Sequence, residues 1–438
     1  MDAINIIGAG LAGCEAAYQL AKRELPVRLY DMKPHKKSPA HTTDRFCELV
    51  CSNSLRSNRL SNAVGLLKEE MRRLDSLVMR AADATCVPAG GALAVDRTLF
   101  SEYVTQEIRE NPKITVFEEE ITDLEELLKT GKTIVAAGPL ASPALSGSIS
   151  KTIGSESLYF FDAAAPIVDG KTIDFAKAFY ASRYERGNDY INCPMTQQEY
   201  YAFYEALRTA ECAEIKDFEH NVFEGCMPIE EIARRGPQTM CFGPLKPKGI
   251  VHPDTGVQPY ANVQLRRENA QGSMFNIVGF QTHLKFPEQV RVFRMIPGLE
   301  HAEFLRYGVM HRNTYIHAPG ILDRYYRCIR QPELFFAGQI TGVEGYVESA
   351  SSGLLAGIFC ACDAAGIAKP DFTSKTAIGA LARYISQDHV EKFQPMNVNY
   401  GIMMPLKRKI RNKEQKNLEI ARIALEEIEC LKEQPFVR

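Results

Sequence analysis

The sequence has no long hydrophobic run. None of its uninterrupted apolar segments reaches the ~18 residues that a membrane-spanning helix requires. At the N-terminus, Met1-Asp2-Ala3 leads directly into a candidate strand, without the basic segment and apolar stretch of a signal peptide. We therefore expect no membrane span and no signal peptide, and we expect a cytoplasmic location.

The sequence also has no cysteine framework. Its 12 cysteines are scattered over 438 residues, and no group of cysteines and histidines has the spacing of zinc ligands. In a chain of this length, scattered cysteines favour the reduced thiols of the cytosol over a disulfide-stabilised scaffold. The sequence therefore predicts reduced thiols and no metal site.

A strong net charge is absent as well. With 52 basic and 54 acidic residues, the formal net charge is −2, which gives no overall attraction for a nucleic acid. A charge run is usually a solvated surface, but three basic runs in a near-neutral chain are consistent with local binding of a polyanion. The runs are Lys407-Arg408-Lys409-Ile410-Arg411-Asn412-Lys413 with Lys416, then Arg324, Arg327 and Arg330, and finally Arg266-Arg267.

A glycine motif near the N-terminus indicates the cofactor class. Gly8-Ala9-Gly10-Leu11-Ala12-Gly13 follows a buried-strand pattern over residues 4–7 and opens a predicted helix over 11–22. The three glycines allow a tight turn, the approach of a diphosphate, and close packing of helix on strand. A second strand over 27–30 ends at Asp31, close to the ~20-residue spacing of a carboxylate that binds ribose hydroxyls. Strand, turn, helix and carboxylate together predict a dinucleotide site.

Two later segments complete the pattern of one domain. Residues 113–138 indicate a strand, a short helix and a small-residue strand, and residues 333–339 indicate another buried strand before a helix over 346–361. This layout is typical of two-dinucleotide flavoproteins with a glutathione-reductase-like topology. We therefore predict an α/β fold with an FAD-binding Rossmann domain made of residues 1–150 and 321–438. A smaller inserted α/β domain occupies residues 151–320, with a helix over 197–213 and a strand over 274–280.

The second half of the predicted flavin site lies at the start of the late helix. Gly338 and Gln339 end the buried strand, and Gln339 stands where this broad class usually has Asp. Gly342 and Gly345 place backbone N–H groups at the helix start, which in this fold faces the pyrimidine edge of the flavin and favours its anionic reduced form. The inserted domain has no second GxGxxG, which argues against a tightly held nicotinamide cofactor but not against a transient one.

Two cysteines are candidate reactive groups. Cys51 lies in Glu48-Leu49-Val50-Cys51-Ser52-Asn53-Ser54, before a predicted helix over 63–81, with Arg45, Arg56 and Arg59 nearby in the sequence. Capping residues and cations favour a thiolate. Cys226 lies on a predicted turn between Gly225 and Pro228. Its local sequence favours a reactive thiol only slightly over the usual role of cysteine as a small buried side chain. Cys47 and Cys51 could form a redox dithiol, although their spacing closes poorly on a helix.

Long motifs spread over nearly the whole chain allow a more specific interpretation. Besides Gly8–Gly13 and Glu48–Ser54, they are Phe223-Glu224-Gly225-Cys226, Arg235-Gly236-Pro237-Gln238-Thr239-Met240, Gly243-Pro244-Leu245-Lys246-Pro247, Val278-Gly279-Phe280-Gln281-Thr282, Arg294-Met295-Ile296-Pro297-Gly298-Leu299-Glu300 and Phe336-Ala337-Gly338-Gln339-Ile340-Thr341-Gly342-Val343-Glu344-Gly345-Tyr346. Together they resemble the TrmFO family of folate- and flavin-dependent tRNA (uracil-5-)-methyltransferases. One departure is Asp31, where the resemblance predicts Glu.

The resemblance implies an activity. The family makes 5-methyluridine in the T-loop of tRNA, with carbon from methylenetetrahydrofolate and electrons from reduced FAD, which also carries the methylene group and is regenerated by NAD(P)H. C5 of uracil becomes nucleophilic once a soft thiolate adds to C6. By resemblance, Cys51 is the nucleophile and Cys226 is a second functional thiol that removes the C5 proton or guards the flavin.

The resemblance also suggests partners for the remaining candidate residues. Gly8, Ala9, Gly10, Leu11, Ala12, Gly13, Asp31, Gly338, Gln339 and Gly345 would bind FAD. Tyr346, and more weakly His283, would contact folate. Lys407, Arg408, Lys409 and Arg411 would contact tRNA.

Several alternatives stay open at this point. A larger wobble-uridine-modifying protein shares the motif at Phe336–Tyr346 but needs a long C-terminal helical domain, whereas only about a hundred residues follow Tyr346 here. A close relative that acts on ribosomal RNA has nearly the same motifs. A flavin-dependent dithiol reductase is favoured by Cys47 with Cys51 and opposed by the missing nicotinamide domain. The last alternative is a flavin-stabilised RNA-binding module without turnover.

Overall fold

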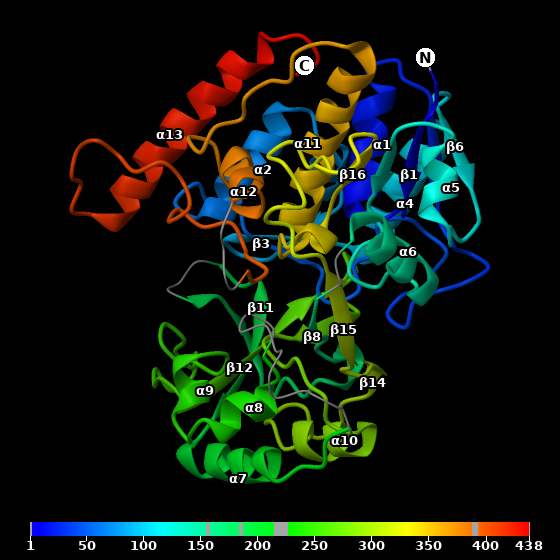
Figure 1. Ribbon diagram of the computed structural model, residues 1–438. Coiled ribbons are helices and arrows are strands. Elements are labelled where there is room, and N and C mark those ends of the chain that lie inside the picture. The colour runs from blue at the N-terminus through cyan, green and yellow to red at the C-terminus, as the bar shows by residue number, and fades with distance from the viewer. Residues whose placement is uncertain (1, 155–157, 184–186, 214–226, 388–392, 438) are drawn as a thin grey trace.

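The computed structural model describes residues 2–154, 158–183, 187–213, 227–387 and 393–437 (Figure 1). Two hydrophobic clusters organise these residues. The larger cluster draws on residues 4–153 and 315–437, and the smaller on residues 165–302. The larger body lies above the smaller one in Figure 1, and both termini lie at its upper end. The division at residues 150 and 320 remains our proposal.

A parallel sheet forms the centre of the larger body. It contains β1 (Ile4–Ile7), β2 (Val27–Tyr30), β6 (Ile114–Phe117), β7 (Thr133–Val135) and β16 (Leu334–Phe336), in the order β16-β7-β1-β2-β6. Every pairing in it is parallel, so the sheet needs helices on its faces. These strands confirm the α/β Rossmann prediction, including the return of the chain through β16 beside β7.

Helices and a small second sheet complete the larger body. The helices are α1 (Leu11–Ala21), α2 (Ala63–Arg73), α3 (Leu77–Ala84), α4 (Arg97–Arg109), α5 (Leu124–Leu128), α6 (Pro143–Ile153), α11 (Tyr346–Ala365), α12 (Ala377–Ile385) and α13 (Lys413–Lys432). The second sheet is antiparallel, with the order β3-β5-β4, and contains β3 (Ser54–Ser57), β4 (Cys86–Val87) and β5 (Ala92–Val95).

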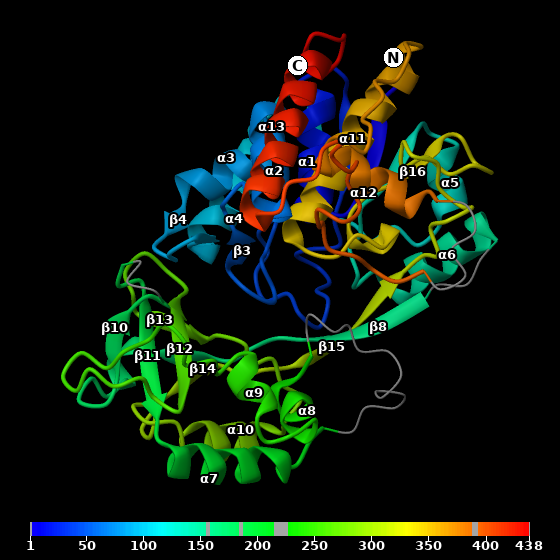
Figure 2. The same ribbon diagram turned by 90° about the vertical axis from the view of Figure 1, so that its left-hand side faces the viewer.

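The inserted body is built on a six-stranded antiparallel sheet in the order β10-β11-β12-β13-β9-β14. Its strands are β9 (Ile167–Asp169), β10 (Phe179–Ala181), β11 (Tyr190–Met195), β12 (Ala261–Arg267), β13 (Met274–Ile277) and β14 (Phe304–Arg306). Its helices are α7 (Gln197–Arg208), α8 (Ile229–Arg234), α9 (Thr239–Phe242) and α10 (Phe286–Phe293), with α7 and α10 at the lower end in both views (Figures 1 and 2).

One two-stranded ribbon joins the two bodies. β8 (Leu158–Ala163) leaves the larger body, and β15 (Met310–Tyr315) returns to it in antiparallel register, with Leu158 opposite Tyr315. Figure 2 shows this ribbon running between the bodies. The inserted body is therefore attached through a pair of hydrogen-bonded strands.

Several predicted element boundaries were wrong, among them a helix predicted over 346–361 that continues to Ala365 and a strand predicted over 333–339 that ends at Phe336. The helix predicted over 63–81 is broken into α2 and α3, because Asp75 has a left-handed φ of 57° and Ser76 caps α3 by accepting from the N–H of Met79. The helix predicted over 197–213 ends at Arg208. The strand predicted over 274–280 ends at Ile277, before the turn at Gly279, whose φ is 79°.

No helix among the described residues is long and apolar enough to cross a membrane.

α1 and α11 pack closely against each other in the larger body. An added Cβ at Gly353 of α11 would lie 2.2 Å from the carbonyl oxygen of Ala12. An added Cβ at Gly357 would lie 3.0 Å from the carbonyl oxygen of Ala16. The absence of side chains here lets α11 pack against the glycine-rich start of α1, which brings the two halves of the predicted dinucleotide site together.

We predict that Gly353→Ala destabilises the protein by about 1–3 kcal/mol, because the new methyl group must push α11 away from α1. The matched control is Gly147→Ala in α6, where an added Cβ meets nothing within 4 Å. That change should leave stability unchanged or raise it by up to about 1 kcal/mol through helix propensity. Denaturant unfolding of both variants measures the difference. Equal stability of Gly353→Ala and the native chain would contradict the close packing.

Candidate dinucleotide cleft and cysteine site

The glycine turn between β1 and α1 is shaped by backbone contacts. An added Cβ at Gly8 would lie 2.6 Å from the carbonyl oxygen of Ala136, and one at Gly13 would lie 1.8 Å from the carbonyl oxygen of Gly8. An added Cβ at Gly10 meets nothing within 4 Å. Gly10 is also the N-cap of α1 and leaves the first N–H groups of the helix without a side-chain cap. The turn therefore presents open space and helix N–H groups together, the arrangement that binds a diphosphate.

A single cleft gathers most of the predicted cofactor residues. It is lined by the ends of β1 and β2, by the segments that follow β7 and β16, and by the starts of α1 and α11. Of the predicted residues, Gly8, Ala9, Gly10, Leu11, Ala12, Asp31, Gly338, Gln339 and Tyr346 line the cleft. Gly13 and Gly345 lie behind this lining: Gly13 packs on Gly8, and Gly345 is the N-cap of α11.

Asp31 fastens the glycine turn to the end of β2. One carboxylate oxygen accepts the N–H of Ala9 at 2.7 Å, and the other accepts the N–H of Lys33 at 2.9 Å. Both oxygens retain further lone pairs toward the cleft. The shorter side chain at this position is therefore held by backbone contacts at the edge of the cleft.

Buried charge surrounds the first turn of α11. Glu348 is fully buried, forms an ion pair with Arg56 and accepts the N–H of Val398 at 2.9 Å. Gln339 donates a hydrogen bond to Glu344, which is also buried. The N-terminal end of α11, which is the positive end of the helix dipole, therefore lies beside the buried carboxylates of Glu344 and Glu348. Arg56 balances the charge of Glu348.

Cys51 lies beside this end of the cleft. Its backbone N–H donates to the hydroxyl of Tyr346 at 2.7 Å, and the N–H of Ser52 donates to the same oxygen at 3.2 Å. Burial raises the pKa of Tyr346, and the neighbouring Cys51 acts in the same direction, so this phenol stays protonated. Tyr346, the first residue of α11, thereby links the Cys51 loop to the cleft that it lines.

Three arginines hold the Cys51 loop by its backbone and side chains. Arg97 donates to the carbonyl of Leu49 at 2.5 Å and, more weakly, to that of Cys51 at 3.4 Å. Arg306 donates to the carbonyl of Val50 at 2.6 Å. Arg266 donates to Ser52 Oγ at 2.7 Å and to Asn53 Oδ1 at 2.9 Å. Every residue from 49 to 53 therefore accepts a hydrogen bond from a guanidinium.

These arginines come from both bodies. Arg97 begins α4 in the larger body, whereas Arg266 and Arg306 lie on β12 and β14 of the inserted sheet. Arg97 also forms an ion pair with the buried Glu268, which directly follows β12. Burial lowers the pKa of Arg266 and of Arg306. The Cys51 loop is therefore fixed where the two bodies meet.

The sequence predicted a different environment for Cys51. The expected helix N-terminus is not there, because β3 follows the loop and α2 begins only at Ala63. Of the expected cations, Arg45 pairs with Glu102 and Arg56 pairs with Glu348. Sequence proximity could not identify Arg97 and Arg306, since they reach the loop from distant elements, and Arg266 was noted only as part of a basic run.

Cys47 has a different neighbour from Cys51. It is buried, its N–H donates to the carbonyl of Ala9 at 3.0 Å, and its thiol lies beside that of Cys14. Burial raises the pKa of Cys14, and hydrogen bonding with Cys47 raises it further. Cys47 thus packs against the glycine turn and also lines the cleft.

Two other predicted site residues, Cys226 and His283, are not found in the cleft among the described residues. Cys226 falls outside the described residues. His283 is 6% exposed in the inserted body, with its Nδ1 2.5 Å from a carboxylate oxygen of Glu230. Burial alone would lower the pKa of His283, but hydrogen bonds with Cys212 and Glu230 raise it to about 9.

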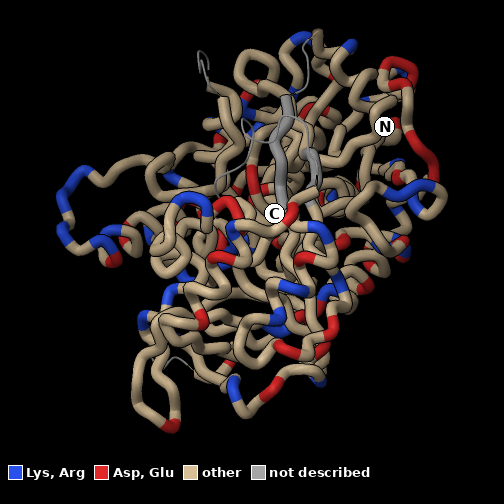
Figure 3. Tube along the Cα trace, turned by 90° about the horizontal axis from the view of Figure 1, so that it is seen from below, with Lys and Arg blue, Asp and Glu red and all other residues tan. Residues whose placement is uncertain are grey.

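Of the three basic runs, the C-terminal one projects into solvent. Lys407, Arg408, Lys409 and Arg411 are exposed in the loop before α13, which extends at the left of Figures 1 and 3. Arg408 pairs with Glu419, and no ion pair is found for the other three within the described part of the chain. In the other runs, Arg324 and Arg327 pair with carboxylates and Arg266 is buried.

Comparison with known proteins identifies the family of this fold and site. A protein named methylenetetrahydrofolate--tRNA-(uracil-5-)-methyltransferase TrmFO from Acetivibrio thermocellus is 60% identical over 427 residues, which are 97% of each chain. A protein of the same name from Listeria monocytogenes is 56% identical over 433 residues, 98% of this chain and 99% of its own. The chain belongs to the TrmFO family.

Two further matches extend the TrmFO assignment to a broader group. The family model described as glucose inhibited division protein A matches residues 3–368. The solved structure of GidA from Aquifex aeolicus superposes with a TM-score of 0.72 at 16% identity, covering 99% of this chain and 74% of that one. This structural match shows that the chain has the fold of the GidA protein from Aquifex aeolicus.

Proposed function

We propose that the protein binds FAD in the described cleft and methylates C5 of a T-loop uridine in tRNA. Methylenetetrahydrofolate is the carbon donor and NAD(P)H the transient electron source. The observation that supports this most directly is the position of Cys51, whose loop is fixed by three arginines and bound to Tyr346 at the edge of a dinucleotide cleft. The names of the relatives, 55–60% identical, supply the reaction.

The cleft fits FAD on structural grounds. Gly10 leaves space at a helix start for the diphosphate, and Asp31 stands at the end of β2 for the ribose. Gly338, Gln339 and Tyr346 line the opposite end, where the flavin ring would lie. When bound, FAD would supply the reducing equivalents and carry the one-carbon unit. The protein would hold the dinucleotide along one continuous surface from β2 to α11.

In this proposal the chain's own contribution to the chemistry is the thiol of Cys51. As thiolate, it adds to C6 of uracil, and the displaced electron pair makes C5 nucleophilic. Once C5 has gained the one-carbon unit, loss of the C5 proton would release that unit from its carrier as an exocyclic methylene. A hydride, which bound FAD would supply, would then convert it to the methyl group as the thiolate leaves C6. The arginine contacts hold the loop in one conformation, which lowers the entropic cost of bringing the sulfur to the base.

Other site assignments remain part of the proposal. Cys226 would remove the C5 proton or guard the flavin. Tyr346 would form one side of the folate site, since it lines the cleft and keeps its hydroxyl hydrogen. His283 fits a folate contact less well, because it is buried against Glu230 in the inserted body.

The alternatives are less well supported. A dithiol reductase would pair Cys47 with Cys51, but Cys47, although it lines the cleft, is buried and its thiol is hydrogen-bonded with that of Cys14. A ribosomal RNA substrate would use the same site, and the relatives' names favour tRNA. The loop at residues 407–411 is our proposed contact for tRNA phosphates, because its four cations are exposed and three of them form no ion pair within the described part of the chain.

We expect Gly10→Val to weaken FAD binding at least tenfold, because the new side chain enters the space for the diphosphate. The fold should persist, since an added Cβ there meets no protein atom within 4 Å. Gly147→Val, at an equally open position in α6, is the control for the substitution itself. The flavin-to-protein ratio and circular dichroism report the two effects. Full flavin content in Gly10→Val would place the cofactor elsewhere.

Cys51→Ala should abolish a covalent adduct with tRNA that carries 5-fluorouridine at the target. Fluorine cannot leave C5 as a cation, so a thiolate that has added to C6 stays attached. Denaturing gel electrophoresis detects the adduct, and flavin absorbance should be unchanged in the variant. Cys86→Ala, which removes an exposed thiol on β4, is the control.

Two results would reject this assignment. An adduct that persists in Cys51→Ala and disappears only in Cys226→Ala would reverse the roles of the two cysteines. The absence of any adduct with the native protein, although tRNA binds and flavin is present, would reject thiol addition itself.

Neutralising Lys407, Arg408, Lys409 and Arg411 together should weaken tRNA binding and flatten its salt dependence by about 0.7–0.9 log units per lost phosphate contact. The control neutralises four exposed cations that each pair with a carboxylate elsewhere: Lys129, Lys151, Lys177 and Arg208. It changes the net charge equally. Equal salt slopes for both variants would show that the loop makes no specific contact.

A further inference from the structure

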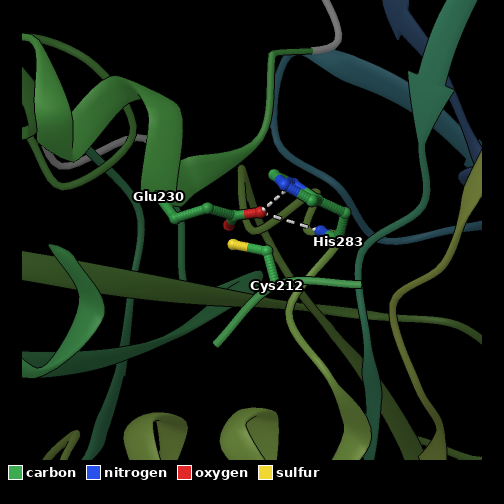
Figure 4. A group of neighbouring side chains, drawn as sticks. All are labelled: Cys212, Glu230 and His283. Atoms are coloured by element: carbon green, nitrogen blue, oxygen red, sulfur yellow. Dashed lines mark hydrogen bonds and ion pairs between the residues drawn. The ribbon is translucent and has the colours of Figure 1, made fainter. Parts of the chain in front are cut away.

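Three side chains of metal-binding type meet in the inserted body, away from the cleft. The thiol of Cys212, a carboxylate oxygen of Glu230 and a ring nitrogen of His283 all lie within 4.8 Å of one another. Figure 4 shows the three side chains pointing toward one another from separate chain segments. Thiolate, carboxylate and imidazole are the ligand types that zinc uses in proteins, usually in a tetrahedron with bonds of about 2.0–2.3 Å.

The backbone holds the three segments in register. The N–H of Ala213 donates to the carbonyl of His283 at 2.8 Å, and the N–H of Lys285 donates to the carbonyl of Glu211 at 3.0 Å. The N–H of Ile229 at the start of α8 donates to the carbonyl of Gln281 at 2.7 Å. The side chains are therefore brought together before any ion binds. Bonds of zinc length would place ligand atoms about 3.3–3.8 Å apart. Side-chain rotations that move these atoms by about 1 Å would therefore complete the site.

Outer hydrogen bonds orient two of the three groups. Thr282 Oγ1 donates to one carboxylate oxygen of Glu230 at 2.8 Å, and the N–H of His283 donates to the other at 2.8 Å. Arg234 donates to the sulfur of Cys212 at 3.5 Å. Contacts of this kind fix ligand orientation in known metal sites and raise their affinity.

Burial and charge also favour a cation. Glu230 is 0% exposed and His283 is 6% exposed, whereas Cys212 is half-buried and gives access from solvent. A thiolate and a carboxylate carry two negative charges, of which Arg234 balances a part at the sulfur, and a divalent cation would neutralise the remainder.

We propose that Cys212, Glu230 and His283 bind one zinc ion, with water as the fourth ligand. The site is independent of the proposed methyl transfer. Cys212 and Glu230 flank residues 214–226 in the sequence, so the ion ties together the two ends of the segment that contains Cys226. Its role is to stabilise the inserted body.

Cobalt substitution tests the site directly. The purified full-length protein is stripped with a chelator and titrated with Co²⁺, whose thiolate charge-transfer and tetrahedral ligand-field bands report a bound cysteine, and then with competing Zn²⁺. The native protein should bind one equivalent with these bands. Cys212→Ser should lose the charge-transfer band, and His283→Gln and Glu230→Gln should weaken binding roughly 100-fold. Cys241→Ser, which changes another half-buried cysteine of the inserted body, is the control.

Thermal unfolding gives a second measurement. Zinc in excess should raise the Tm of the native protein and of Cys241→Ser, because an ion that binds only the folded state stabilises it. Cys212→Ser should show no such rise, and this change of one half-exposed atom should not prevent folding. A native protein that binds no more metal than Cys212→Ser, or whose Tm does not respond to zinc, would show that Glu230 and His283 form only a buried ion pair beside a thiol.

Discussion

The ion pair between Arg97 and the buried Glu268 joins the two bodies of the molecule at the Cys51 loop. A carboxylate with 1% exposure is stable only when its charge is balanced, and Arg97 supplies that charge from the other body. The same guanidinium donates to the carbonyl of Leu49, so the pair that holds the bodies together also positions the loop. Arg266 and Arg306 extend this contact from the inserted sheet. The loop conformation therefore depends on how the two bodies meet.

Sequence patterns were sufficient where structure is determined locally. The turn from Gly8 to Gly13, the strands around it and the return through β16 follow from short-range rules of turn chemistry and buried-strand composition, and the structure confirms them. The break between α2 and α3 was missed because a single residue, Asp75, adopts a left-handed conformation within a helical pattern. Such a break depends on packing of both helices and has only a weak local signal.

The candidate site shows the same limit more strongly. Gly10, Asp31 and Gly338 could be found from sequence, because each occupies a fixed place in a βαβ pattern. The environment of Cys51 could not, since its cations arrive from α4, β12 and β14 across the fold. The group of Cys212, Glu230 and His283 was equally hidden, because its members are widely separated in the chain and follow no zinc-ligand spacing.

The ribbon of β8 and β15 has a mechanical consequence. Two strands paired in register resist twisting and sliding more than a single connecting strand, but they can bend together across the plane of the ribbon. Bending of this ribbon would tilt the inserted body against the larger one, and the ion pair between Arg97 and Glu268 opposes that tilt. Arg266 and Arg306 belong to the inserted body and bind the Cys51 loop of the larger body. A large substrate that tilts the inserted body would apply force to the loop through these two arginines, so substrate docking and the placement of the sulfur become parts of one motion.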